Sequence, residues 1–496
     1  MSQLLSAAWV RVLACLPLCA GCASNVEADE AVQARVRAAV QQQIEQDIIQ
    51  KAGPAILVAR IESAVKQEMD EQKIPAVGLA VVRGGQVLVA RGFGLANLEH
   101  QVPASERTIF QSGSVGKQFT AVAVMLQVED GKLALDDKLS KHFPDAPASW
   151  SAITVEHLLT HTSGIPDYTP QDVDFRRDYN DEELAQAAYK LPLEFAPGSR
   201  WNYSNTGYVL LGILVKKVSG EFYGDVLKSR VFAPLGMRTA RVISERDLVP
   251  HRAAGYELDG EEWKNQEWVA PSLNTTADGA LYLSIEDFIA WDAGLRAGKV
   301  LRPESWRRVF TPVKLASGKS YPYGFGWSID ERGGAALIQH GGAWQGFKAM
   351  IARFMGADLT VIVLANVAQA DPAAIVDAVA ELCEPALARP ALAPLEDREP
   401  KVTSRVRELL EQTARGALKP EDFAFVRAGF FPGAAQYFAK VLEPLGAPRE
   451  LILLERRELG DDTSYMYRVV FADAVLLLGV QFAPDGRLAN FGVRPE

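Results

Sequence analysis

Apolar residues recur at every fourth position near the beginning of the chain. The repeating positions are Val32, Val36, Val40, Ile44 and Ile48, with mostly polar residues between them. This spacing places the apolar side chains in one narrow stripe along a helix. We therefore expect an N-terminal spacer helix over residues 23–55. The dipeptide Gly53-Pro54 interrupts the pattern, and a second helical pattern then leads to Pro75.

Beyond Pro75 the spacing of apolar residues becomes typical of strands. Strand-like runs lie at 77–82, 87–92, 336–340, 347–354 and 359–367. The first two are separated by Arg83-Gly84-Gly85-Gln86, which favours a hairpin because glycine accepts positive φ. Helical patterns dominate between about 110 and 330, and another follows at 372–383. The layout predicts an α+β domain over residues 56–385, in which both ends form one antiparallel sheet, flanked by helices, with a helical subdomain inserted between them.

A smaller domain is expected after a linker. Residues 386–400 are rich in proline and show no apolar periodicity, as in linkers. Residues 401–496 begin with helical patterns around 402–412 and 423–429 and end in four strand-like runs. They predict a small α+β accessory domain that resembles cystatin-like domains. It contains no histidine, so we assign it to packing or partner binding rather than to catalysis.

The composition is that of a folded protein, with 48% hydrophobic and 23% charged residues. A chain of 496 residues is too long for one ordinary core, which agrees with more than one domain. The formal net charge of −10 would repel a polyanion, and no run of Lys and Arg is present to follow phosphates. The sequence therefore argues against nucleic acid as a partner.

The first 22 residues predict export as a signal peptide. Residues 4–20 form an apolar stretch too short to span a bilayer comfortably, and small residues follow it. The segment 18–22 is similar to a bacterial lipobox, in which cleavage before Cys22 leaves that cysteine to carry a lipid anchor. Cys19 stands where such boxes usually carry leucine, and ordinary cleavage after Ala23 is the alternative. We expect a periplasmic or outer-membrane lipoprotein, attached to the membrane through Cys22.

The segment Gln111-Ser-Gly-Ser-Val-Gly-Lys117 places Ser114 three residues before Lys117, at the start of a helical pattern. Residues three apart on a helix are neighbours, so the lysine amine can lie beside the serine hydroxyl. The beginning of a helix also offers unpaired N–H groups and a positive dipole end, which favour an oxyanion on an attacked carbonyl. Alone, such a pair is more often an N-capping serine followed by a surface lysine.

A second motif, Tyr203-Ser204-Asn205, lies in a polar turn before an apolar helix. Tyr203 is a candidate general base in its phenolate form, if the Lys117 ammonium lowers the pKa of its hydroxyl. Asn205 is a candidate for holding a substrate amide. The alternative for Tyr203 is a half-buried aromatic residue at the start of a helix.

A third motif, His340-Gly341-Gly342-Ala343, ends a predicted strand. Its glycines allow a substrate to lie against the strand edge, and the Ala343 N–H is a candidate second oxyanion donor beside the N–H of Ser114. By itself, His-Gly-Gly is common in loops. The order of the three motifs therefore carries more weight than any one of them.

The three motifs in this order resemble the serine β-lactamase and penicillin-binding protein superfamily. Further stretches similar to its class C β-lactamase-like branch lie at 130–136, 153–165, 234–237 and 340–347. That branch includes class C β-lactamases, D-alanyl-D-alanine carboxypeptidases, D-aminopeptidases and family VIII esterases. The resemblance covers roughly residues 60–385. It implies a β-lactamase-like fold, Ser114 as the acylated nucleophile, Lys117 and Tyr203 as the proton-handling pair and Ala343 as an oxyanion donor. No cofactor or metal is expected.

One motif departs from the pattern of the branch. Its β-lactamases carry lysine-threonine-glycine where this chain has His340-Gly341-Gly342. The histidine is more similar to the esterases and D-peptidases, and the missing hydroxyl at Gly341 removes a contact to a substrate carboxylate. We expect an exported serine hydrolase that acts on small esters, amides or peptides, with weak or no β-lactamase activity. The alternatives are a D-alanyl-D-alanine carboxypeptidase or β-lactamase acting in cell-wall metabolism, and a catalytically silent peptide-binding protein.

Two other patterns are rejected. His157 and His161 lie four residues apart, but Leu158 breaks the His-Glu-x-x-His pattern of zinc proteases, so we assign both histidines to helix packing. The segment Ser112-Gly-Ser-Val-Gly116 lacks the first glycine of the Gly-x-Ser-x-Gly nucleophile elbow. The sequence therefore predicts neither a metal site nor an α/β-hydrolase fold.

Overall fold

The computed structural model describes residues 36, 40–41, 53–169 and 172–496. It divides the chain into two units, Met1–Leu57 and Val58–Glu496. The predicted signal peptide with Cys22 lies outside the described residues, and so does most of the expected spacer helix. Within the described part of the chain, no helix is both long enough and apolar enough to cross a membrane.

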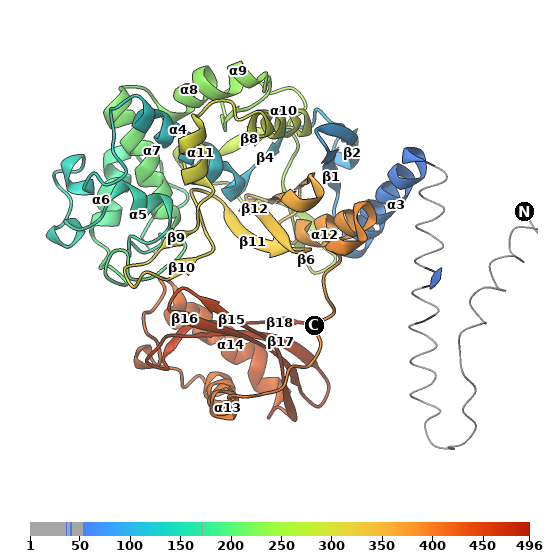
Figure 1. The fold of residues 1–496 in the computed structure, drawn as a ribbon, viewed down its shortest axis with the longest axis vertical. Coiled ribbons are helices and arrows are strands. Elements are labelled where there is room, and N and C mark those ends of the chain that lie inside the picture. Colours follow the sequence, from blue (N-terminus) through green and yellow to red (C-terminus); the bar gives the residue numbers. More distant parts are fainter. Residues whose placement is uncertain (1–35, 37–39, 42–52, 170–171) are drawn as a thin grey trace, which may run out of the picture. The chain divides into compact units, whose positions relative to one another are not determined.

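A seven-stranded antiparallel sheet forms the centre of the larger domain (Figure 1). Its strands, in spatial order, are β11 (Ser328–Arg332), β12 (Ala335–Trp344), β13 (Phe347–Phe354), β14 (Leu359–Ala365), β1 (Ala76–Arg83), β2 (Gln86–Asn97) and β3 (Val102–Pro103). The two ends of the domain meet where β1 pairs with β14, with Val81 opposite Val361. The predicted α+β fold, with one antiparallel sheet made from both ends of the domain, is thereby confirmed.

Helices cover both faces of this sheet. All seven residues of β14 are buried, although successive side chains of a strand point to opposite faces, so neither face is open to solvent there. Helix α10 (Ile285–Arg296) packs against β1 and β14, and α12 (Pro372–Cys383) packs against β13 and β14. Helix α3 (Pro54–Gln72) precedes the first strand.

The inserted helical part lies between β3 and β11. Besides α10, its helices are α4 (Lys117–Glu129), α5 (Val155–Leu159), α6 (Asp181–Tyr189), α7 (Asn205–Ser219), α8 (Tyr223–Leu227), α9 (Ala233–Leu235) and α11 (Pro303–Val309). Its short strands are β4 (Phe110–Gln111), β5 (Arg241–Val242), β6 (Tyr256–Asp259), β7 (Glu262–Asn265), β8 (Leu281–Leu283), β9 (Val313–Lys314) and β10 (Ser320–Tyr321). Helices α4 and α7 pack against each other, and nearly all of α4 is buried. Close packing therefore holds the first residues of both helices at fixed positions.

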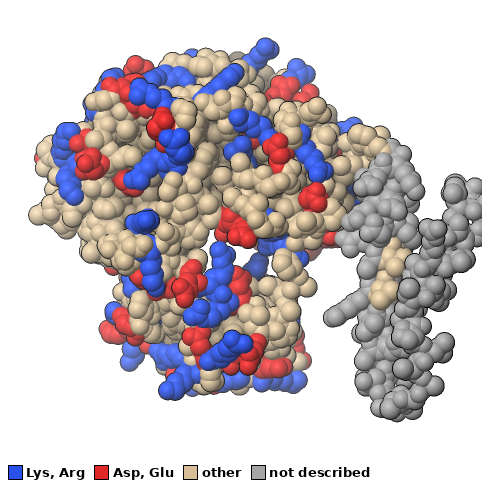
Figure 2. Space-filling model, in the orientation of Figure 1, with Lys and Arg blue, Asp and Glu red and all other residues tan. Residues whose placement is uncertain are grey.

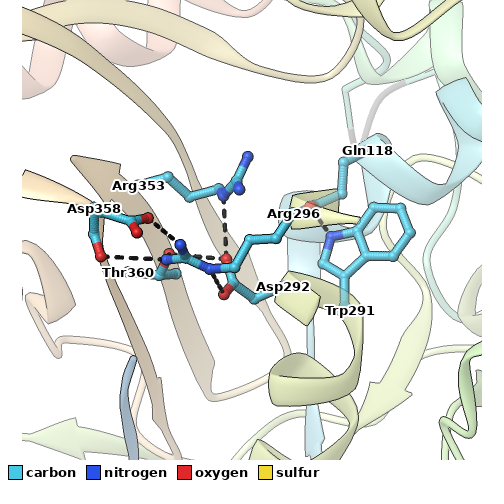
Figure 3. Close-up of polar contacts among 7 residues, drawn as sticks. All are labelled: Gln118, Trp291, Asp292, Arg296, Arg353, Asp358 and Thr360. Carbon is cyan, nitrogen blue, oxygen red and sulfur yellow. Dashed lines mark hydrogen bonds and ion pairs between the residues drawn. The ribbon is translucent and has the colours of Figure 1, made fainter. Parts of the chain in front are cut away.

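Buried polar contacts tie α10 to the sheet and to α4 (Figure 3). The Asp292 carboxylate, 1% exposed, accepts hydrogen bonds from Arg296 Nε at 2.6 Å and from Arg353 Nε at 3.2 Å. Removing one partner of a buried pair of this kind typically costs about 3–5 kcal/mol. The neighbouring Trp291 Nε1 donates to Gln118 Oε1 at 2.6 Å, which fixes the first turn of α4.

The C-terminal domain has its own core and sheet. Helices α13 (Pro400–Ala414) and α14 (Ala435–Leu442) accompany the antiparallel strands β15 (Glu450–Leu459), β16 (Asp462–Val470), β17 (Val475–Phe482) and β18 (Leu488–Pro495), which pair in chain order. A separate cluster of buried residues, including Leu410 and Leu478, lies between them. The helical pattern expected at 423–429 is wrong: these residues are irregular, because Phe423 forms a bridge to Leu488 and helix α14 begins only at Ala435.

Candidate active site

Ser114 lies in a short turn pressed against β12. After β4 the chain forms a single 3₁₀ turn over Gly113–Gly116, and α4 itself begins at Lys117. Gly113 has φ of +49°, and a Cβ there would lie 2.3 Å from the Ala343 nitrogen. A Cβ at Gly342 would lie 3.0 Å from the Ser114 nitrogen. These close approaches require glycine at both positions. They press the Ser114 turn against β12, so the backbone amides of Ser114 and Ala343 lie close to each other.

A small cavity lies at this contact. Its volume is about 70 Å³, and its lining includes Ser114, Ala343, Asn205, Tyr168 and Trp344. The two backbone amides that the sequence predicts as oxyanion donors therefore belong to residues of one cavity wall. The geometry suits a carbonyl that is attacked by Ser114 and holds its developing negative charge between two N–H groups.

Lys117 is fully buried behind the serine. Its Nζ donates to Ser114 Oγ at 3.1 Å, to Asn205 Oδ1 at 2.6 Å and to the Asp278 carbonyl oxygen. Burial lowers the pKa of the amine to about 8, against the opposing effect of the Asp278 and Asp167 carboxylates. A lysine with this pKa is partly neutral near neutral pH, and its neutral form can accept the Ser114 proton directly.

Tyr203 is brought to the site, but the expected lowering of its pKa is wrong. Burial raises the pKa of its hydroxyl well above the ordinary value, and the nearby Ser114 side chain opposes this rise. The Lys117 Nζ lies 4.9 Å from the centre of the tyrosine ring, so its charge faces the ring rather than a phenolate oxygen. Within the described residues, the Tyr203 hydroxyl makes no hydrogen bond of ordinary geometry. It is therefore a protonated phenol, suited to donating a proton, and Lys117 is the better acceptor.

Asn205 is the first residue of α7, after Ser204, which caps the helix by accepting the Gly207 N–H at 3.1 Å. The Asn205 amide accepts from Lys117 and donates through Nδ2 to Asp167 Oδ2 at 2.9 Å. Its backbone N–H also donates to the Asp167 carboxylate, at 2.8 Å. Asn205 lines the cavity, but its side chain is already engaged inside the protein, and a contact to a substrate amide stays a prediction.

His340 faces the interior rather than the cavity. Its Nδ1 lies 2.6 Å from the Gly341 carbonyl oxygen, and its Nε2 lies 3.0 Å from the Tyr323 hydroxyl. Burial lowers the pKa of the ring to about 4, so it is neutral at physiological pH. Both ring nitrogens are therefore used within the protein, and a contact of His340 to substrate stays a prediction. Gly342 is required sterically by the Ser114 turn, whereas a Cβ at Gly341 would meet ordinary distances.

His161, assigned to helix packing from the sequence, instead joins the second and third motifs. Its Nδ1 accepts the Ser204 N–H at 3.1 Å, so the neutral ring carries its proton on Nε2, which lies 3.2 Å from the Tyr323 hydroxyl. Tyr323 then donates to His340 Nε2. This series of hydrogen bonds, from His161 through Tyr323 to His340, crosses the core between segments far apart in sequence. No local sequence pattern indicates it. His157 forms the capping box of α5 with Thr154.

One further residue, Asp167, was not identified from the sequence as part of the site, whereas Tyr168, Trp201, Trp344 and Phe347 were candidates for lining the cleft. Asp167 anchors the start of α7, and the Tyr168 hydroxyl donates to Asp278 Oδ2 at 2.9 Å. Tyr168 and Trp344 line the cavity, whereas Phe347 is buried. Among the residues that the structure describes, no three His, Cys, Asp or Glu side chains gather in a way that could hold a metal ion.

Comparisons with known proteins agree with this geometry. The family model described as Beta-lactamase matches residues 61–384. Penicillin-binding protein 4* of Bacillus subtilis is 31% identical over 302 residues, which cover 57% of this chain and 66% of that protein. D-aminopeptidase of Gluconobacter oxydans is 28% identical over 302 residues, which cover 59% of this chain and 56% of that protein. The match thus spans between about half and two thirds of these relatives' lengths.

A solved structure is similar over more of the chain. The octameric penicillin-binding protein homologue from Pyrococcus abyssi matches 88% of this chain and 96% of its own, with 24% sequence identity and a TM-score of 0.59. At this identity the likeness concerns the fold alone. It extends beyond the region that the family model matches.

Proposed function

Because the chain belongs to the beta-lactamase family, as the match over residues 61–384 shows, we propose that it is an exported serine hydrolase that cleaves small esters or amides through an acyl-Ser114 intermediate. One observation carries this proposal: a buried lysine with a pKa near 8 donates to the Ser114 hydroxyl at 3.1 Å. An activated nucleophile needs a proton acceptor at this distance.

The residues of the site suggest the following steps. Neutral Lys117 takes the proton of Ser114 as Oγ attacks the substrate carbonyl carbon, and the N–H groups of Ser114 and Ala343 stabilise the oxyanion. The carbon–leaving-group bond then breaks, and the leaving alcohol or amine takes a proton from the Lys117 ammonium or the Tyr203 hydroxyl. Water attacks the acyl-serine, gives a proton to the same pair, and releases the acid while Ser114 recovers its hydroxyl.

The substrate class follows from the third motif and from the relatives. Several of the similar proteins are named D-aminopeptidase, which supports amides of D-amino acids as well as simple esters. His340 is neutral and engaged internally, and Gly341 has no hydroxyl, so this strand offers no side chain for the carboxylate of a β-lactam. On the face shown in Figure 2, acidic and basic side chains are interspersed, and neither sign forms a continuous field.

Intact-mass spectrometry with three substrate groups tests this function. We expect a transient mass increase equal to the acyl group with p-nitrophenyl esters and D-amino-acid amides, and little or no increase with β-lactams. The reason is that an acyl-enzyme accumulates wherever deacylation is slower than acylation. Peptide mapping should place the adduct on Ser114. Hydrolysis without any adduct at Ser114, even after rapid acid quenching, would contradict the proposed intermediate.

Export and lipid attachment form a separate part of the proposal. They rest on the lipobox-like segment that ends at Cys22. We expect Cys22→Ser to move the full-length protein from the membrane fraction to the soluble fraction after cell lysis, because the acylated cysteine would be lost. Cys383→Ser is the matched control, since that thiol is buried in the larger domain. Unchanged partitioning of Cys22→Ser would mean that the segment is only a cleaved signal.

A further inference from the structure

The C-terminal domain contacts the segment that leads directly into Tyr203. Arg200 Nη1 donates to the Asp462 carboxylate at the start of β16, at 2.7 Å. The Asp462 side chain is only 9% exposed, and Gln481 on β17 donates to its second oxygen at 3.0 Å. The Arg200 guanidinium also lies over the ring of Phe425, 5.8 Å from its centre. A carboxylate that is shielded from solvent and accepts two hydrogen bonds holds its partners in place, unlike an ion pair on the solvated surface.

A second contact holds the other end of the same segment. The Glu194 carboxylate accepts the backbone N–H of Ala428, in the C-terminal domain, at 3.0 Å. Its other oxygen accepts from Asn202 Nδ2 at 2.5 Å. Burial raises the pKa of Glu194, and these two donors oppose the rise. Asn202 immediately precedes Tyr203, so one carboxylate connects the C-terminal domain to the residue next to the catalytic tyrosine.

Between these two contacts the segment packs closely. The Trp201 ring stacks on Tyr321, with ring centres 4.3 Å apart and planes 11° apart, and lies 6.4 Å from the ring of Tyr203. The turn between β15 and β16 reaches the same surface: a Cβ at Gly460 would lie 2.5 Å from the Leu315 side chain. A shift of the C-terminal domain would therefore move the Arg200 side chain and the aromatic residues that pack beside it.

From these contacts we propose that the C-terminal domain positions the active site, and that Asp462 is a positioning residue acting through Arg200 on Tyr203. The proposal rests on the function proposed above, since it assigns a consequence for proton transfer at Ser114. Because the Tyr203 hydroxyl makes no ordinary hydrogen bond among the described residues, the place of Tyr203 depends on its ring contacts, such as that with His161, and on the backbone on either side of it. Asp462 and Glu194 bind the side chains of Arg200 and Asn202, which both lie just before Tyr203 in the chain.

Kinetics of Asp462→Ala in the full chain test the proposal. We expect kcat for a p-nitrophenyl ester to fall about tenfold with KM within about twofold, because displaced catalytic groups slow the chemical step more than they weaken binding. The double variant Arg200→Gln/Asp462→Ala should lose no more than the larger single loss, since the two residues act as one unit. Asp462→Asn provides a milder change if Asp462→Ala folds poorly.

Arg457→Gln is the matched control. Arg457 lies on β15 and pairs with Asp330 across the same two domains, but it bonds no residue of the segment 200–202. We expect its kcat to stay within about twofold of the wild type, as is usual for exposed pairs. If Arg457→Gln loses as much kcat as Asp462→Ala, the effect is general domain coupling and the positioning role is overturned.

Hydrogen–deuterium exchange of the peptide spanning residues 199–206 gives a readout that does not need catalysis. We expect faster exchange there in Asp462→Ala than in the wild type or Arg457→Gln, with unchanged exchange in β1. If the wild type hydrolyses no ester or amide, the proposed function fails, but this exchange still decides whether Asp462 holds the segment. Unchanged exchange together with unchanged kcat would overturn the inference.

Discussion

Replacing Ser114 by alanine will abolish turnover of p-nitrophenyl esters, with a loss of about 10⁴-fold or more in kcat. The nucleophilic oxygen is removed, and among the described residues no other hydroxyl is bonded to the Lys117 amine. The fold should be unaffected, because Lys117 keeps its bonds to Asn205 and the Asp278 carbonyl. Initial rates with purified protein, together with circular dichroism, provide the measurement.

Ser112→Ala is the control, two residues away in the same turn. The buried Ser112 hydroxyl donates to the Gly279 and Gly113 carbonyls, at 2.9 and 3.0 Å, and the hydrogen bonds of Lys117 go to other groups. We expect this variant to retain the acyl adduct and most of its turnover. Retained turnover in Ser114→Ala, or loss of the adduct only in Ser112→Ala, would contradict the assignment of the nucleophile.

The sheet was predictable because its strands carry their own signal. Continuous apolar runs and the Gly84-Gly85 turn indicate β1, β2, β13 and β14 without knowledge of their neighbours. The same logic failed at 423–429, where apolar residues spaced like a helix belong to an irregular segment. There Phe423 is held by its bridge to Leu488, a contact that sequence spacing cannot show.

The candidate site likewise has features that could be predicted from the sequence and features that could not. The close approach of Ser114 and Lys117 was predictable from their three-residue spacing, although a 3₁₀ turn rather than α4 carries the serine. The ordered motifs placed Tyr203 and Ala343 beside this pair. The direction in which the Tyr203 pKa is shifted was not predictable. It depends on how deeply the hydroxyl is buried and on where the Lys117 ammonium lies relative to the ring. Likewise, the link from His161 through Tyr323 to His340 joins segments far apart in the chain and depends on tertiary packing.

The identity of the proton acceptor leads to a distinct pH dependence. Among the described residues that surround Ser114, burial raises the pKa values of Tyr203 and Tyr168, and burial lowers that of His340 to about 4. The Lys117 amine, with a pKa of about 8, titrates near neutral pH. Its neutral fraction grows as pH rises, so kcat/KM should increase with pH and level off above about 8.

Lys117→Arg will remove this rise and lower kcat/KM by about 10³-fold or more, because the guanidinium stays protonated across the accessible pH range. The positive charge is kept, so the comparison separates proton transfer from simple charge stabilisation. Lys132→Met, at an exposed lysine, is the control and should leave the profile unchanged. The measurement is kcat/KM for an ester from pH 5.5 to about 10, corrected for spontaneous hydrolysis. If kcat/KM of Lys117→Arg still rises with pH at the same midpoint, the proton acceptor is another group. If the rise disappears in this variant, the buried lysine is the base that activates Ser114.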